Sequence, residues 1–195
     1  MKTVGIHRAE SVWMNSIAPR LQAGLLGSST NKNTRVITGG RLAYRNEVFR
    51  YNDTKPSESK LIAYQTDILV REELGNGLWV PRVVIECKLA SVTTHDALTY
   101  SAKAETHKQV HPYLRYGILI GDHEKKAVPR RLFRHGAYFD FMAAWNAKEP
   151  SGEEWNGLIG VLRLEIEAPR QIEKLVTGIA SKYSLVHRRL ILKSV

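Results

Sequence analysis

Cysteine is almost missing from this sequence, and so are long apolar runs. Cys87 is the only cysteine among 195 residues, which excludes a disulfide framework and a cysteine-based zinc site. No run of 18 apolar residues occurs, so no membrane span is predicted. The N-terminal stretch MKTVGIHRAE lacks the apolar core of a secretory signal. We therefore expect a soluble cytoplasmic protein of prokaryotic or phage type that makes no contact with a membrane.

Acidic residues are scarce relative to basic ones. The chain has 29 Lys and Arg against 19 Asp and Glu, and its formal net charge is +10. The excess lies in three stretches, residues 1–46, 125–139 and 174–195, which together contain a single acid, Glu10. Basic surface of this kind attracts phosphate backbones. The charge therefore favours a nucleic-acid partner, although many soluble proteins are basic without one.

The length and a hydrophobic fraction of 43% fit one globular domain. Apolar residues at every fourth position from Ala9 to Leu25 predict a helix, which Pro19 should kink or split. The other predicted elements are helices at 96–111, 138–147 and 169–182, strands within 35–51 and at 61–71, 80–90, 116–122, 156–167 and 184–193, and polar loops at 27–34 and 52–59. This order predicts an α/β (α+β) fold with a central, mixed but mostly antiparallel sheet flanked by helices.

Two apolar strands carry charges where a buried strand should have none. YQTDILV contains Asp67, and VVIECKL contains Glu86 and Lys88. Between them lies Asn76-Gly77, the strongest short signal for a two-residue turn. A turn centred there places Asp67 opposite Glu86, with their β-carbons about 4.5–5.5 Å apart. Lys88 then shares their face, Gln65 is its cross-strand partner and could support it, and the other face is apolar core.

Two facing carboxylates repel each other, so one should take up a proton unless a cation lies between them. A hard divalent cation with oxygen ligands fits that gap. Lys88 would hold a phosphate oxygen or help to deprotonate a water on the cation. The geometry suggests a Mg²⁺ site that faces a phosphodiester. The structural alternative is a buried salt bridge, in which Lys88 neutralises both acids and stabilises the fold little.

Asp67, followed after a hairpin by Glu86-Cys87-Lys88, resembles the signature of the PD-(D/E)xK nuclease superfamily. This group includes many type II restriction endonucleases and Holliday junction resolvases. Glu-x-Lys occurs three times in the chain, but only here within an apolar strand and with an acid across a turn. The resemblance covers about residues 9–122, a catalytic core of helix, three-stranded meander, helix and strand, and leaves 123–195 as a C-terminal extension of the same domain.

The resemblance implies a restriction-endonuclease-like core and a role for each residue of the motif. Mg²⁺, which Mn²⁺ is expected to replace, would be held by Asp67, Glu86 and the backbone carbonyl of Cys87. Lys88 would lie near the attacking water, and the products would carry 5′-phosphate and 3′-hydroxyl ends. Thr66 stands where many members have a proline before the Asp, a position that varies in the family.

Further matches to the family are weaker. Some members carry Gln-x-x-x-Tyr on the helix after the Lys, and Gln109 and Tyr113 match it, although Pro112 is awkward for a continuous helix. Some members use a glutamate of the first helix as an additional metal ligand. Glu10 is the acid available there, and its alternative role is that of a first-turn acid favoured by the helix dipole. Glu47 is the reserve for the metal ligand.

Other patterns are less specific. His107 and His111 have i, i+4 spacing and could bind zinc, but no third ligand or catalytic Glu accompanies them, and a polar helix face is the alternative. Lys103 and Lys108 on the same helix could support the site or contact a phosphate backbone. The best candidates for DNA contact are arginines of the two basic stretches after residue 124, namely Arg130, Arg131, Arg134, Arg188 and Arg189.

These features predict a Mg²⁺-dependent DNA endonuclease that acts on double-stranded DNA as a homodimer, with a type II restriction-like enzyme as the first choice. The first alternative is a repair or junction-resolving nuclease of the same fold. The alternative from another class is a non-catalytic nucleic-acid-binding module. Such a module would be expected to lose at least one of Asp67, Glu86 and Lys88, and all three are present.

Overall fold

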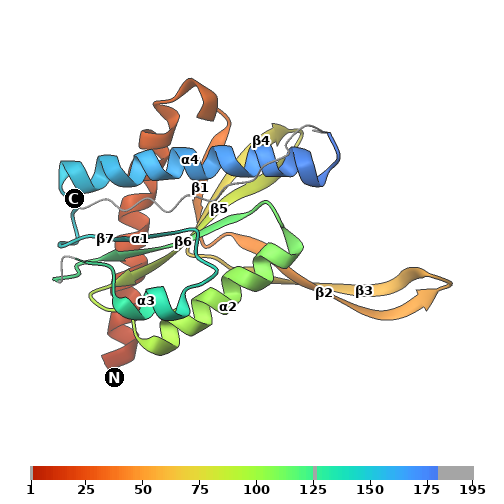
Figure 1. Ribbon diagram of the computed structural model, residues 1–195, viewed down its shortest axis with the longest axis horizontal. Helices are drawn as coiled ribbons and strands as arrows, with labels where there is room; N and C mark the ends of the chain where they lie inside the picture. Colours follow the sequence, from red (N-terminus) through yellow and green to blue (C-terminus); the bar gives the residue numbers. More distant parts are fainter. Residues whose placement is uncertain (1, 125–126, 180–195) are drawn as a thin grey trace.

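Helices cover both sides of one central sheet, and a long hairpin extends from it (Figure 1). The computed structural model describes residues 2–124 and 127–179. Its elements are, in chain order, α1 (Lys2–Leu26), a 3-10 turn (Ser29–Asn31), β1 (Thr34–Thr38), β2 (Arg41–Asn52), β3 (Lys55–Gln65), β4 (Ile68–Gly75), β5 (Leu78–Leu89), α2 (Thr94–Val110), β6 (Arg115–Gly121), α3 (Arg130–His135), β7 (Phe141–Ala144) and α4 (Gly152–Val176). Within the described residues, no helix combines the length and the apolar character needed to cross a membrane.

Five strands form the central sheet in the order β1-β4-β5-β6-β7. The β1–β4 and β4–β5 pairs are antiparallel, whereas the β5–β6 and β6–β7 pairs are parallel. The predicted α/β class, with a mixed sheet flanked by helices, is therefore confirmed. Antiparallel pairing predominates only when the separate β2–β3 pair is counted together with this sheet.

Alternation of side chains along β5 divides the sheet into two different faces. Ile85 and Cys87 join a core with α1 and α4, to which those helices contribute Trp13, Ile17, Leu21, Leu25, Leu158, Ile159, Leu162 and Ile166. Each such aliphatic side chain stabilises the fold by about 1.5–3 kcal/mol when fully buried. Val84 lies on the opposite face, in a core with α2 and α3. Glu86 shares that second face because strand side chains alternate.

The hairpin between β4 and β5 has the predicted turn and, at its charged end, the predicted register. Asn76 and Gly77 both have positive φ, of 52° and 77°, as a type I′ turn requires. Ile68 lies opposite Ile85 as the first pair of the ladder, so Asp67 directly precedes this pair on one strand and Glu86 directly follows it on the other. The register shifts by one residue after Val70 and shifts back before Gly75, so two irregularities cancel and the predicted pairing is kept.

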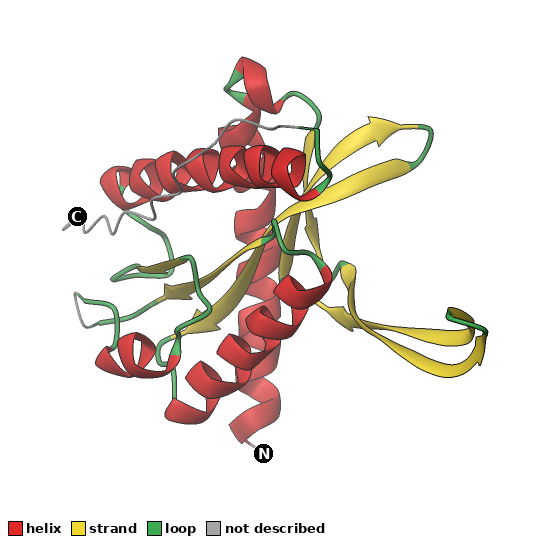
Figure 2. Cartoon of the chain, turned by 45° about the vertical axis from the view of Figure 1, so that its right-hand side comes forward, coloured by secondary structure: helices red, strands yellow, loops and turns green. Residues whose placement is uncertain are grey.

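β2 and β3 form a two-stranded arm that extends away from the sheet in both views (Figures 1 and 2). The polar loop predicted at 52–59 is wrong over most of its length, because β3 already begins at Lys55. The chain reverses at Asp53, whose φ is +55°, a conformation that Asp tolerates. Pro56 lies within β3, which has β2 as its only partner in the described chain, and proline is acceptable in such an edge strand.

The strand predicted at 156–167 is wrong, because these residues belong to helix α4. Ser151 and Glu154 form a capping box that starts the helix. Leu158, Leu162 and Ile166 are buried at i, i+4 spacing, which is typical of a helix. All three stand at even-numbered positions, so they also fit the every-second-residue pattern of a strand. The helix continues through Pro169 to Val176, so the helix predicted from residue 169 begins much earlier.

The helix predicted at 138–147 is also wrong. Residues Phe141–Ala144 form β7, which pairs in parallel with β6 at the edge of the sheet. The open edge of β6 supplies hydrogen-bond partners that a short helix would leave unused. In α1 the helix runs through Pro19 without ending there. The strand predicted at 184–193 lies outside the described residues.

Candidate active site

Asp67 lies between the end of the arm and the start of β4, and Glu86 lies near the end of the neighbouring strand β5. Asp67 stands just before β4, and its carboxylate Oδ2 accepts a hydrogen bond of 2.8 Å from the backbone N–H of Cys87. The Cys87 side chain itself lies in the opposite, apolar core, as the alternation predicts. Glu86 is 1% exposed. The Asp67 carboxylate raises the pKa of Glu86, so the two carboxylates lie close enough to repel each other, as the hairpin predicts.

The Glu86 carboxylate is held by two groups that come from the elements after it. Lys103 Nζ of α2 lies 2.7 Å from its Oε1, and the Tyr116 hydroxyl of β6 donates to the same oxygen. Burial raises the pKa of Glu86 and the neighbouring Asp67 adds to the rise, so the pKa stays above its ordinary value although Lys103 opposes the shift. Lys103, rather than Lys88, is therefore the cation that neutralises this carboxylate.

One oxygen of each carboxylate remains unused by the described residues. No hydrogen bond from that part of the chain reaches Asp67 Oδ1 or Glu86 Oε2. Within residues 2–124 and 127–179, no three His, Cys, Asp or Glu side chains are grouped as a metal site. Mg²⁺ does not need such a group, because it is commonly bound through one or two carboxylates and completed by water and phosphate. The donors present fit that mode.

Lys88 lies beside the carboxylate pair but contacts other acids. Its Nζ is 3.5 Å from Glu10 and 3.5 Å from Asp96, and it lies 5.5 Å from the centre of the Tyr100 ring. Burial lowers the pKa of Lys88, but Tyr100, Glu10 and Asp96 raise it by more, so the net shift is upward. Lys88 therefore stays an ammonium group. The alternative in which Lys88 neutralises Asp67 and Glu86 is not what the structure has.

Glu10 reaches this cluster from α1, on the other side of the sheet. Its Oε1 accepts a hydrogen bond of 3.4 Å from the backbone N–H of Leu89, next to Lys88. The alternative role as a first-turn acid is wrong, because α1 begins at Lys2 and has no acid in its first turn. Glu10 is thus a partner of Lys88 at the edge of the cluster.

Two predicted supporting residues belong to the arm. Gln65 pairs with Arg41 of β2 and not with Lys88, because the chain leaves the arm at Thr66, whose N–H donates to the Gly40 carbonyl. The backbone carbonyl of Gln65 still accepts a hydrogen bond of 3.0 Å from Lys103. Glu47 lies opposite Lys60 within the arm and forms an ion pair of 2.9 Å with Arg45. The structure does not bring Glu47 to the cluster.

Gln109 and Tyr113 do not act as a pair in the way the sequence pattern predicts. Helix α2 ends at Val110, so they do not share a continuous helix face. Gln109 is exposed. Burial raises the pKa of Tyr113, and its charged neighbours are Glu173 and Arg82, at the other end of β5. The tyrosines near the carboxylates are instead Tyr100 and Tyr116.

Sequence reasoning missed three residues of the site, Asp96, Tyr100 and Tyr116, and only noted Lys103 as a helix residue that could support it. A signal for most of them exists in α2. Asp96, Tyr100 and Lys103 follow i, i+4, i+7 spacing, which places them on one helical stripe. That stripe faces the charged positions of β5. A polar stripe on a helix that must cover a strand with buried charges therefore marks the partners.

His107, near the end of α2, and His111, which follows the helix, form no zinc site within the described residues. His107 is fully buried between the rings of Tyr44 and Tyr116, and its Nδ1 donates a hydrogen bond of 3.0 Å to the Ala43 carbonyl. Burial lowers the pKa of His107 to about 4, so the imidazole is neutral. His107 joins the arm, through Ala43 and Tyr44, to the tyrosine that holds Glu86.

The predicted DNA-contact arginines lie partly within the described chain. Arg130, Arg131 and Arg134 are exposed on α3, which Leu132 anchors in the core. Phe133 beside them is 63% exposed. The other two arginines predicted for this role, Arg188 and Arg189, lie outside the described residues.

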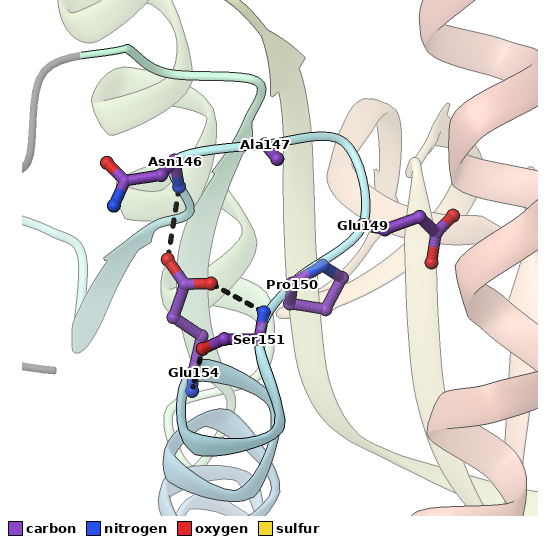
Figure 3. A pocket seen from close by; sticks show the side chains of 6 residues that line it. All are labelled: Asn146, Ala147, Glu149, Pro150, Ser151 and Glu154. Carbon is purple, nitrogen blue, oxygen red and sulfur yellow. Dashed lines mark hydrogen bonds between the residues drawn. The ribbon is translucent and has the colours of Figure 1, made fainter.

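A hollow of about 500 Å³ lies elsewhere, at the start of α4 (Figure 3). Glu154 dominates it, but both carboxylate oxygens are already used. One accepts from the Asn146 N–H at 3.1 Å and the other from the Ser151 N–H at 2.7 Å. These contacts fix the entry to the helix, and Glu149, the other carboxylate that lines the hollow, forms an exposed ion pair with Arg20.

Comparison with protein-family models and with curated proteins finds no match for this chain. Function therefore has to be inferred from the fold and from the cluster around Asp67 and Glu86.

Proposed function

We propose that this protein is a Mg²⁺-dependent DNA endonuclease of the PD-(D/E)xK type, which hydrolyses phosphodiester bonds in double-stranded DNA in the cytoplasm. One observation carries the proposal. Asp67 accepts a hydrogen bond from the N–H of Cys87, the residue after Glu86, each carboxylate keeps one oxygen without a hydrogen bond from the described residues, and Lys88 follows Glu86 by two positions on the same face of β5. The order of α1, a meander, α2 and β6 is also that of the expected catalytic core.

The metal would be held by Asp67 Oδ1, Glu86 Oε2 and the Cys87 carbonyl. When bound, it would stabilise negative charge on the phosphate and on the leaving oxygen. The protein fixes its two carboxylates in advance, Asp67 through the Cys87 N–H and Glu86 through Lys103 and Tyr116. This fixed geometry reduces the reorganisation that binding of the cation requires.

Lys88 acts in this proposal as a hydrogen-bond donor and not as a base. Its raised pKa keeps it protonated at neutral pH, and Glu10 and Asp96 hold it from two helices. An ammonium group in that position can orient the attacking water and bind a phosphate oxygen. Burial raises the pKa of Tyr100, which lies next to Lys88, to about 12.

DNA would contact two basic surfaces near this cluster. The arm leaves the body at Gln65, close to Asp67, and residues 41–65 contain five Lys or Arg against three acids. A two-stranded ribbon has the size that the major groove of DNA admits. Exposed arginines of α3, which packs on α2, supply the second surface. A homodimer of type II restriction-like enzyme is our first choice within this class.

Cleavage of a supercoiled plasmid tests the proposal. The purified protein is expected to cut with Mg²⁺ and not with EDTA, whereas Asp67→Asn and Lys88→Ala are expected to lose at least about a thousandfold in rate, because each removes a group needed only at the reacting phosphate. Glu124→Gln is the matched control, since Glu124 also begins a Glu-x-Lys but is exposed on a loop.

Intact plasmid at high concentrations of wild-type protein, or normal cutting by both variants, would refute the mechanism. The pattern of products separates the two nuclease classes. Discrete bands would indicate sequence-specific restriction, and a smear would indicate a repair or junction-resolving nuclease.

A further inference from the structure

Lys103 makes two contacts that link the candidate site to the arm. Its Nζ lies 2.7 Å from Glu86 Oε1 and 3.0 Å from the Gln65 backbone carbonyl. The Lys103 side chain is 14% exposed and that of Glu86 is 1% exposed. Such a close ion pair inside the protein is screened little by solvent. Lys103 is thus a cation that already pairs with Glu86, one of the two carboxylates, in the absence of a metal.

Lys108, on the same helix, makes the same kinds of contact as Lys103, but the carboxylate that it contacts differs from Glu86 in its other hydrogen bonds. Its Nζ lies 2.7 Å from Asp140 and 2.6 Å from the Tyr138 carbonyl, again a buried carboxylate and a backbone oxygen. Both oxygens of Asp140 are used, since Arg115 contacts Oδ1 and the Tyr116 N–H donates to Oδ2. Glu86 keeps Oε2 without a hydrogen bond from the described residues. In the Lys108–Asp140 pair both carboxylate oxygens are occupied, whereas in the Lys103–Glu86 pair one carboxylate oxygen has no hydrogen bond from the described residues.

We propose that Lys103 is a positioning residue that serves as the internal counter-ion of Glu86 and sets how tightly Glu86 and its neighbour Asp67 bind a divalent cation. It fixes Glu86 through Oε1, which leaves Oε2 facing the cation. Its positive charge also offsets one of the two negative charges and repels the incoming metal. This inference rests on the proposed function, because it concerns the same cation.

The charge on Lys103 therefore has a consequence opposite to that of an ordinary structural salt bridge. A neutral side chain at this position leaves two uncompensated carboxylates, so the protein without metal becomes less stable and the site attracts a divalent cation more strongly. A structural salt bridge would lose stability on mutation without any gain in metal affinity. Lys103→Arg keeps the charge and should behave as the wild type.

The experiment is a titration with Mn²⁺ at pH 8 in the absence of DNA, followed by electron paramagnetic resonance, with melting temperatures measured over the same series. Lys103→Met is expected to bind Mn²⁺ about tenfold more tightly or better, because one repelling charge is removed. Without metal, the melting temperature of Lys103→Met should be lower than that of the wild type. Addition of Mn²⁺ should raise the melting temperature of the variant by more than it raises that of the wild type. Lys103→Arg should restore the wild-type affinity, and Lys108→Met, the matched control, should leave it unchanged.

Every outcome decides the matter. A folded Lys103→Met that binds Mn²⁺ as the wild type does, or more weakly, would overturn the proposal, and so would a variant that stays unfolded in saturating Mn²⁺. A variant that folds only when Mn²⁺ is added supports it. If the wild-type protein binds no Mn²⁺, the proposed function fails as well. If the metal affinities change as expected and the plasmid is never cut, the proposed function alone fails.

Discussion

The two ends of strand β5 each carry a cluster of buried charges, and the clusters are built differently. At one end Arg82 lies 2.7 Å from Glu72 and 2.5 Å from Glu173, and Arg170 lies 3.0 Å from Glu72. These contacts tie the hairpin to α4. Burial raises the pKa of Glu72, but Arg170 and Arg82 lower it by more, so its pKa lies below the ordinary value.

At the other end of β5, around Glu86, the effect of burial on the carboxylate pKa outweighs that of the neighbouring cation. Glu86 has a raised pKa, and Asp67 has no ion-pair partner within residues 2–124 and 127–179. One carboxylate oxygen on each residue is left open there, whereas both oxygens of Glu72 are contacted by arginine. Buried charge alone therefore does not mark a functional site. Carboxylates that the described residues leave incompletely matched are the better candidates for one, because a bound cation can complete them.

The largest effects are expected from two matched substitutions, Glu86→Gln and Glu72→Gln, which test whether the two ends of β5 differ in role. Glu86→Gln should reduce Mg²⁺-dependent plasmid cleavage at least about a thousandfold, about 4 kcal/mol in activation free energy, because it removes a charge that the metal needs. Its free energy of unfolding should fall by less than that of Glu72→Gln, because burial already disfavours the charge it removes and Lys103 keeps its hydrogen bond to the Gln65 carbonyl. Urea denaturation and plasmid cleavage measure both quantities.

Glu72→Gln should give the opposite result. It removes one of the two carboxylates that hold Arg82, whose side chain is 5% exposed, and it also removes the carboxylate that pairs with Arg170; breaking a buried pair of this kind costs about 3–5 kcal/mol of stability. Cleavage per folded molecule should stay within about twofold of the wild type. If the two substitutions affected stability and cleavage alike, the division of β5 into a structural and a functional end would be wrong.

The pH dependence of stability should also separate the two ends. The pKa of His107 is about 4 in the folded protein and 6.5 is its ordinary value, so protonation favours the unfolded chain. The free energy of unfolding should therefore be full above about pH 6.5 and fall by up to about 3 kcal/mol as the pH drops to 4. Glu72, whose pKa is lowered, contributes stability that is lost only below about pH 4.5.

Denaturation of wild type and His107→Gln at several pH values provides the check. The variant should lose the component between pH 6.5 and 4 and keep the component below it. The same slope in both proteins between pH 7 and 4.5 would mean that His107 is not the group that titrates. His107 supports Tyr116, and through it Glu86, so the test concerns the functional end of β5.

The turn at Asn76-Gly77 made the site predictable, because one local backbone preference fixes which residues face each other across a hairpin. Cys87 and Ile85 on the apolar face were predictable from the same alternation. Asp96 and Lys103 could have been found from the polar stripe of α2, whereas Tyr116 comes from β6, a strand whose pairing with β5 no local pattern specifies. The prediction for residues 156–167 was wrong because even-numbered apolar positions fit both a strand and a helix.

The smallest expected effect concerns charges that face solvent. Arg82 and Arg170 are matched by carboxylates, whereas Arg130 and Arg131 on α3 have no ion pair within the described chain. The double variant Arg130→Gln/Arg131→Gln should weaken DNA binding about tenfold at moderate salt, and the slope of log affinity against log salt should decrease by about two, one for each lost phosphate contact. Arg20→Gln, which loses an exposed pair with Glu149, is the control and should leave the slope unchanged. Fluorescence anisotropy of a labelled duplex in EDTA measures both values without cleavage. A wild-type slope in the double variant would remove α3 from the DNA surface and leave the arm, which begins beside Asp67, as the remaining basic surface near the carboxylates.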